Sequence, residues 1–181
     1  MIAVIFAATL LVRIVTALGN IDVALDPLHA PRSTAGFMHC VDSGKLSGTT
    51  FYRTARADNQ AKPPSHTMVI QGGLNADASP FGTVPLERTG QTGLHNVEGT
   101  IGVPRDAAPN TGSPCDFYIN MKNDPHLDSE RAKDGNGYAI FGHVVAGMDV
   151  ARKIWTAPAK GQKLTPPIRI ERIVRVKAST P

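Results

Sequence analysis

The 181-residue chain has few of the side chains that nucleic-acid-binding proteins use to stack on bases. It contains one tryptophan, three tyrosines and six phenylalanines, and its lysines and arginines are spread along the sequence. The formal net charge of +4 therefore indicates a solvated basic surface, and no nucleic-acid partner is expected. The 41% hydrophobic and 19% charged composition is typical of a globular protein with one domain.

Cysteine is also scarce. Cys40 falls in a helical pattern and Cys115 in a turn-rich loop far along the chain. This placement favours two inert thiols over a disulfide.

Several catalytic and metal-binding motifs are missing from the sequence. The six histidines form no H-x-x-x-H pair and have no Cys-x-x-Cys partner, which argues against a metal site. There is no G-x-S-x-G elbow and no P-loop. We therefore expect neither a metal nor a cofactor.

The longest apolar run is short. Residues 1–11 are almost wholly apolar, but they have no basic region before them and cannot span a bilayer, so no stable membrane association is expected. The run is either the remnant of a signal peptide or an extension of the first strand, and the first interpretation is favoured. The expected organisation is an apolar segment over 1–11, a single domain over 12–177 and a tail over 178–181.

Glycine and proline are plentiful, with 17 and 14 residues, and they favour short strands joined by turns. Residues 12–16 and 21–25 are expected to form a hairpin with its turn at Gly19-Asn20. Further strands are expected at 49–54, 68–71, 100–103, 117–121, 138–141, 143–145 and 167–176. The last strand is expected to place Ile168, Ile170, Val174 and Val176 on one face. With helices expected only at 30–42 and 148–155, this pattern indicates a closed barrel or a sandwich.

Two of these short apolar strands each contain one conspicuous polar residue. Arg53 follows Phe51-Tyr52, and Gln71 lies in Met68-Val69-Ile70-Gln71. A polar loop over 57–66 separates the two strands. Arg53 could simply form a surface salt bridge, but an arginine in an apolar strand is costly unless it has a task. The pair therefore predicts a binding face for a neutral polar ligand such as a peptide.

Six short motifs, in order along the chain, resemble those of the cyclophilin peptidyl-prolyl isomerases. They are Phe51-Tyr52-Arg53, Ile70-Gln71-Gly72-Gly73, Gly99-Thr100-Ile101, Asp116 to Asn120, Leu127-Asp128 and Gly137 to Gly142. Residues 144–150 are most similar to the bacterial branch. The resemblance implies a mainly β fold, a closed eight-stranded antiparallel β-barrel capped by two α-helices. It also implies a prolyl isomerase that assists folding; the alternative is a non-catalytic proline-peptide-binding or chaperone module.

The resemblance also implies a set of site residues. Arg53 matches the catalytic arginine. The expected substrate-binding residues are Met68, Gln71, Pro104, Arg105, Asp116, Phe117, Tyr118, His126, Leu127 and Tyr138. Strand alternation allows only one of Phe117 and Tyr118 to face a ligand. Tyrosine at 118 replaces the family's usual phenylalanine.

The expected partners are proline-containing peptides and unfolded protein clients, and the expected state is a monomer. Bacterial members of the family occur in the cytoplasm and the periplasm. The apolar N-terminal run favours the periplasm.

Overall fold

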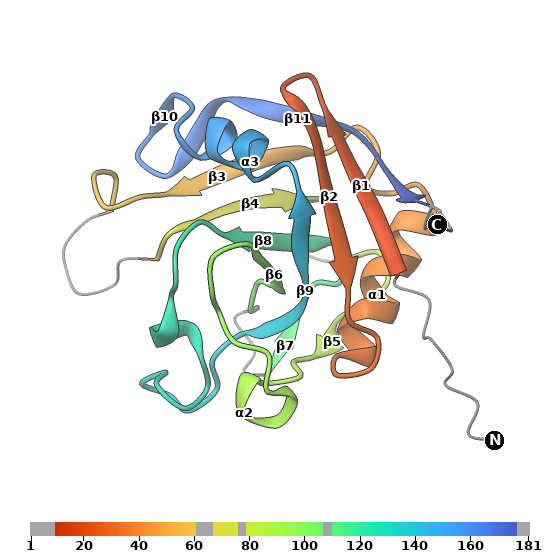
Figure 1. Cartoon of the computed structure of the whole chain (residues 1–181), viewed down its shortest axis with the longest axis vertical. Helices are drawn as coiled ribbons and strands as arrows, with labels where there is room; N and C mark the ends of the chain where they lie inside the picture. Colours follow the sequence, from red (N-terminus) through yellow and green to blue (C-terminus); the bar gives the residue numbers. More distant parts are fainter. Residues whose placement is uncertain (1–9, 61–66, 76–78, 107–109, 177–181) are drawn as a thin grey trace.

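Eight antiparallel strands close into a barrel in the computed structural model of the chain, which describes residues 10–60, 67–75, 79–106 and 110–176 (Figure 1). Around the barrel they are β1 (Leu10–Thr16), β2 (Gly19–Leu25), β9 (Ala139–Ala146), β6 (Thr100–Val103), β8 (Asp116–Asn120), β4 (Val69–Gly73), β3 (Thr50–Ala55) and β11 (Lys163–Val176). The last of these, β11, pairs back onto β1 and closes the ring. The predicted barrel is confirmed.

Three short strands lie outside the ring. β10 (Ala159–Lys160) pairs with the start of β11, and β5 (Val84–Pro85) pairs with β7 (Thr111–Gly112). The sequence did not predict these two-residue strands, because segments this short have no periodicity to detect.

The two predicted helices are α1 (Pro31–Asp42) and α3 (Met148–Trp155), which lie at opposite openings of the barrel (Figure 1). A third, single-turn helix α2 (Thr89–Thr92) was not predicted, and a 3₁₀ turn covers Pro125–Leu127. Within the described residues, no helix has the length and apolar character needed to cross a membrane.

The N-terminus of α1 is held by a side chain far along the sequence. Pro31 occupies the first helical turn, where its missing N–H costs nothing. Glu87 accepts hydrogen bonds from the backbone N–H groups of Arg32 and Ser33, at 3.0 and 2.8 Å. A carboxylate at this end satisfies free donors and complements the helix dipole. The contact therefore ties α1 to the segment that precedes α2.

Aromatic rings fill the centre of the barrel. Phe37 from α1 packs against Phe117 and Phe141, with ring centroids 5.8 and 5.2 Å apart, and Phe51 packs edge-on to Phe117 at 5.6 Å. All four rings have at most 1% of their surface exposed. This core holds the strands that form the site in fixed register.

The two cysteines form a disulfide, so the prediction of two inert thiols was wrong. Cys40 lies on the inward face of α1 and Cys115 immediately precedes β8; their Cα atoms are 5.5 Å apart and both side chains are fully buried. The two residues are 75 positions apart. Sequence alone gave no sign that α1 packs beside the start of β8.

Two further predictions of local structure were wrong. The hairpin turns at Ala17-Leu18, because Thr16 pairs directly with Gly19 and the second strand starts there. On β11, a bulge opposite Val15 and Thr16 shifts the inward face, so Ile173 is buried and Val174 is exposed. A bulge adds one residue and thereby reverses the alternation beyond it.

The domain limits predicted from the sequence fall partly outside the described residues. Leu10 and Leu11, assigned above to the apolar N-terminal segment, belong to β1 and pair with Leu25 and Val176. Residues 1–9, 61–66 and 177–181 lie outside the part of the chain that the structure describes.

Candidate active site

Arg53 and Gln71 lie opposite each other on β3 and β4, where they are register partners. A bulge between Phe51 and Arg53 interrupts this pairing. Consecutive strand residues normally point to opposite faces, but a bulge can turn both toward one side. As a result, Tyr52 and Arg53 line the same cavity.

A line of hydrogen bonds connects these residues, and we call it the Arg53 chain. The guanidinium of Arg53 donates from Nη1 to Gln71 Oε1 at 2.9 Å and from Nε to Gln162 Oε1 at 2.8 Å. Gln71 Nε2 donates to the hydroxyl of Tyr52 at 2.7 Å. That hydroxyl donates to Asp116 Oδ1 at 3.3 Å. The Arg53 chain thus joins β3, β4 and β8 and the turn before β11 through neutral amides and one phenol.

The positive charge of Arg53 has no carboxylate partner among the described residues, since both of its acceptors are amide oxygens. Burial lowers the pKa of Arg53, while the nearby Tyr138 and Tyr52 oppose the shift. A guanidinium has five N–H donors, and two are used here. The remaining donors are available to a ligand.

Asp116, at the far end of the Arg53 chain, is 6% exposed. Burial raises the pKa of its carboxyl, and hydrogen bonds from the Asn75 N–H and from Ser113 and Tyr52 oppose the shift. Burial and the neighbouring Asp116 also raise the pKa of Tyr52. Tyr52 therefore stays neutral, and its hydroxyl donates to Asp116 while it accepts from Gln71 and so orients that amide.

Four cavities meet around these residues and form one groove. The smallest, about 60 Å³, is lined by Arg53, Thr67, Val69, Gln71, Tyr118, Leu127 and Tyr138. A cavity of about 290 Å³ shares Arg53 with it, and one of about 200 Å³ shares Gln71. The fourth, of about 570 Å³, shares Tyr138. All three tyrosines of the chain line this groove.

The small cavity has an apolar floor outside the main core. Val69, Tyr118 and Leu127 pack in a second cluster with Ala55 and Ile140. The ring of Tyr138 stands edge-on to that of Tyr118, with centroids 5.9 Å apart. A cavity with this apolar floor, beside a cation, suits a ligand that has a compact apolar ring next to a polar atom.

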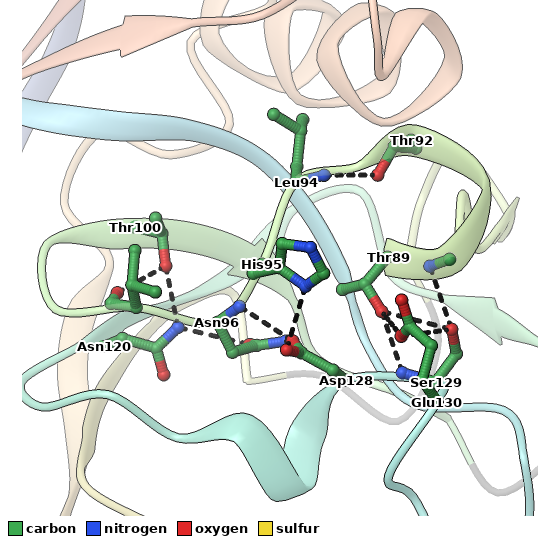
Figure 2. Close-up of polar contacts among 12 residues, drawn as sticks. Thr89, Thr92, Leu94, His95, Asn96, Thr100, Asn120, Asp128, Ser129 and Glu130 are labelled. Atoms are coloured by element: carbon green, nitrogen blue, oxygen red, sulfur yellow. Dashed lines mark hydrogen bonds and ion pairs between the residues drawn. The ribbon is translucent and has the colours of Figure 1, made fainter.

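Tyr118 is held by a second, buried line of hydrogen bonds, which we call the Asn96 network; Figure 2 shows the part of it around Asn96, Asn120 and Asp128. The Tyr118 hydroxyl donates to Asn96 Oδ1 at 2.6 Å, and Asn120 Nδ2 donates to the same oxygen at 3.2 Å. The backbone N–H and Nδ2 of Asn96 donate to Asp128 Oδ1 at 2.8 and 2.7 Å. His95 Nδ1 lies 3.0 Å from Asp128 Oδ2.

Gly102 on β6 gives Tyr118 the space that it occupies. A β-carbon at this position would overlap the ring and hydroxyl of Tyr118 and would lie 2.7 Å from the carbonyl oxygen of Ala139. Any larger residue at position 102 would therefore move the wall of the small cavity.

The structure brings most of the predicted site residues together. Arg53, Gln71, Tyr118, Leu127 and Tyr138 line the small cavity. The others in the groove lie in the adjoining cavities: Pro104, Arg105, Asp116 and His126.

Met68 and Phe117 lie elsewhere. Phe117 has no exposed surface and packs between Phe37 and Phe51, so alternation along β8 places Tyr118 on the groove side. Met68 packs against the main core, and its backbone N–H donates to Asp124 Oδ2 at 2.7 Å. Neither side chain lines the four cavities.

Twelve groove residues were not predicted: Tyr52, Thr67, Val69, Asn75, Asp106, Ser113, Arg131, Ala132, Lys133, Asp134, Gln162 and Lys163. Counting back two residues from Gln71 would have identified Val69, because strand side chains repeat every second position. Gln162 had no sequence signal, since it comes close to Arg53 only because β11, which begins at the next residue, pairs with β3. Within the described residues, no group of histidine, cysteine and acidic side chains is placed to hold a metal ion.

Comparison with known proteins gives a consistent match. The family model described as cyclophilin type peptidyl-prolyl cis-trans isomerase/CLD matches residues 11–175. Peptidyl-prolyl cis-trans isomerase A of Dickeya dadantii is 36% identical over 152 residues, which cover 82% of this chain and 74% of that protein. A peptidyl-prolyl cis-trans isomerase of Acinetobacter baylyi is 31% identical, covering 83% of this chain and 74% of its own length.

Solved structures of cyclophilin-type isomerases have a similar fold. A cyclophilin-type peptidyl-prolyl cis-trans isomerase from Cryptosporidium parvum superposes with a TM-score of 0.76 at 23% identity, over 96% of this chain and 99% of that one. A structure of the same protein in the presence of the dipeptide Ala-Pro has a TM-score of 0.73, also at 23% identity, over 91% and 97% of the two chains. At this identity the likeness supports the barrel fold.

Proposed function

The chain belongs to the cyclophilin-type peptidyl-prolyl cis-trans isomerase family, on its bacterial branch, and we propose that Arg53 is the residue that catalyses its isomerisation of X-Pro bonds. One observation carries the proposal. Arg53 is a half-buried cation, held by two amide oxygens and facing a cavity with an apolar floor, and no described carboxylate neutralises it.

The chemistry of rotation about the X-Pro bond explains how such a cation speeds isomerisation. The X-Pro amide resists rotation with a barrier of about 18–20 kcal/mol because resonance holds it planar. In the twisted state the nitrogen becomes pyramidal and gains a lone pair. A guanidinium that donates to this lone pair stabilises the twisted state and not the planar one, so it lowers the barrier.

The rest of the groove holds the substrate in place. The proline ring enters the small cavity between Val69, Tyr118 and Leu127, and Tyr138 closes it from one side. Gln71, fixed by Tyr52, hydrogen-bonds the substrate backbone beside the proline. An oriented substrate reaches the twisted state with less loss of entropy at the moment of reaction. The substrates are proline-containing segments of peptides and unfolded proteins, as the Ala-Pro dipeptide of the Cryptosporidium structure suggests.

Substitution of Arg53 tests the proposal. A charge-assisted hydrogen bond is worth about 1.5–3 kcal/mol, so Arg53→Ala should lower kcat/KM by roughly 10- to 150-fold. Peptide affinity should change by less than about 3-fold, because the bond forms in the twisted state. Isomerisation is measured by protease-coupled assay on a proline tetrapeptide and affinity by calorimetry.

Two matched variants complete the experiment. Arg172→Ala removes an exposed arginine from β11 and should behave as wild type. Arg53→Lys keeps the charge without the planar fork and should recover only part of the rate. Equal turnover by wild type and Arg53→Ala would contradict the assigned role. No turnover by wild type would favour the alternative of a non-catalytic peptide-binding module.

A further inference from the structure

A large cavity with basic side chains lies beside the proline site, and we call it the basic cavity. It has a volume of about 570 Å³ and is lined by Arg105, His126, Arg131, Ala132, Lys133, Asp134 and Tyr138. Most of these residues belong to the loop between β8 and β9. In Figure 1 this loop hangs below the edge of β8 at the lower left.

The charges in the basic cavity are unbalanced. Arg105 is paired with Asp134, with Nη1 and Oδ2 in direct contact at 2.6 Å. Arg131 and Lys133 are exposed, and neither takes part in an ion pair with any residue that the structure describes. Three permanent cations thus face one carboxylate, and two of the cations have no acidic partner. A cavity of this kind attracts an anion.

The basic cavity continues directly from the proline site. Tyr138 lines both the small cavity and the basic cavity, and the Arg105 guanidinium stacks over the Tyr138 ring with its carbon 5.3 Å from the centroid. An extended peptide advances about 3.3 Å per residue, so a chain with its proline in the small cavity passes over the basic cavity within one or two residues. The two cavities are therefore parts of one peptide-binding surface.

We propose that the basic cavity is a specificity subsite that binds the aspartate or glutamate side chain of a client, one or two residues from the proline. The proposal rests on the function proposed above, and it adds a preference among clients. Arg131 and Lys133 supply the charge, while Arg105 is fixed in place by Asp134 and Tyr138. Because the cations are exposed, we expect a modest preference of roughly 3- to 10-fold at low salt, and screening should reduce it.

Peptides that differ only in one charge test this subsite. Four series carry glutamate, glutamine or lysine at the first or the second residue before, or at the first or the second residue after, a single proline. Isomerisation by the full chain is followed by two-dimensional NMR exchange, which needs no coupled protease and is not biased by protease specificity. We expect the glutamate peptide to exceed its glutamine partner in kcat/KM by roughly 3- to 10-fold in at least one series, and the ratio to approach one in 0.5 M salt.

Variants that remove charge from the basic cavity test whether Arg131 and Lys133 cause the preference for glutamate. In Arg131→Gln/Lys133→Gln the glutamate-to-glutamine ratio should fall to about one. In Arg131→Glu/Lys133→Glu the lysine peptide should be preferred over the glutamate peptide. The matched control Arg169→Gln/Arg172→Gln removes the same charge from exposed positions on β11 and should keep the wild-type ratio.

Two results would overturn the proposal. One is an equal rate for glutamate and glutamine peptides in all four series at low salt. The other is a wild-type ratio retained by Arg131→Gln/Lys133→Gln. Failure of the underlying function is distinguishable, because turnover of the neutral glutamine peptide tests Arg53 independently of the ratio.

Discussion

The Arg53 chain and the Asn96 network are two lines of polar side chains that reach the same small cavity and use their hydrogen bonds differently. In the Asn96 network, Asn96, Asp128 and Tyr118 are at most 6% exposed. Asn96 bonds to both of the others, and Figure 2 shows its bond to Asp128. In the Arg53 chain, Arg53 and Gln71 are half-buried and Arg53 keeps donors available to a ligand. The internal hydrogen bonds of the Asn96 network make it rigid, whereas the unused donors of Arg53 allow the Arg53 chain to bind a ligand. Loss of the first should therefore lower stability, and loss of the second should lower rate.

The largest expected effect comes from Asp128→Ala. This change removes the acceptor for the backbone and side-chain N–H groups of Asn96, both of which are buried. A buried donor without a partner costs about 1–3 kcal/mol, so the free energy of unfolding should fall by ~3 kcal/mol or more. Urea denaturation measures it. Asp149→Ala, on the exposed face of α3, should match wild type. A similar loss in both variants would contradict the stabilising role assigned to the Asn96 network.

A smaller effect is expected from Tyr118→Phe and Asn96→Ala, taken singly and together. The single changes each break the 2.6 Å bond between the Tyr118 hydroxyl and Asn96, so their effects on stability should not add. We expect a coupling energy of about 1 kcal/mol from the double-mutant cycle. Tyr118→Phe should keep most of the isomerase rate, because the ring that forms the cavity wall remains. A coupling energy of zero would show that Asn96 does not act through this hydroxyl.

The smallest expected effect concerns pH and the Arg53 chain. Burial raises the pKa of Asp116 in the folded protein above that of an exposed carboxyl, so the folded state binds the proton more tightly. Its contribution to stability is present below the unfolded pKa, near 3.9, and is lost as pH rises through the folded pKa. Asp116→Asn cannot ionise, so its stability relative to wild type should increase as pH rises above about 4 and should level off once pH exceeds the folded pKa. The slope should stay below the one-proton limit of about 1.4 kcal/mol per pH unit.

Urea titrations at several pH values measure this difference. Asp149→Asn, which changes an exposed carboxyl, serves as the control. Parallel pH profiles for wild type and Asp116→Asn would contradict the effect assigned to burial.

Sequence patterns identified the Arg53 chain better than the Asn96 network. Arg53 and Gln71 stood out because each is a polar side chain in a short apolar strand, and ordered motifs linked them to a family. The Asn96 network had no such signal, since Asn96 and Asp128 lie in irregular segments and meet only when the fold brings the two segments together. The bulges on β3 and β11 could not be predicted from the sequence either, because each depends on pairing with another strand. Side-chain alternation could select one of Phe117 and Tyr118, but only the packed barrel shows which one faces inward.

The bond between Cys40 and Cys115 has a consequence for how the protein is made. Both sulfur-bearing side chains are fully buried, so oxidants and reductants reach them only before the barrel closes or when it opens. Closing a loop across 75 residues is expected to stabilise the fold by about 4 kcal/mol. Such bonds persist in proteins that fold in oxidising compartments such as the bacterial periplasm. The thiol content of the purified protein, counted by alkylation under denaturing conditions, therefore reports the redox conditions under which that sample folded.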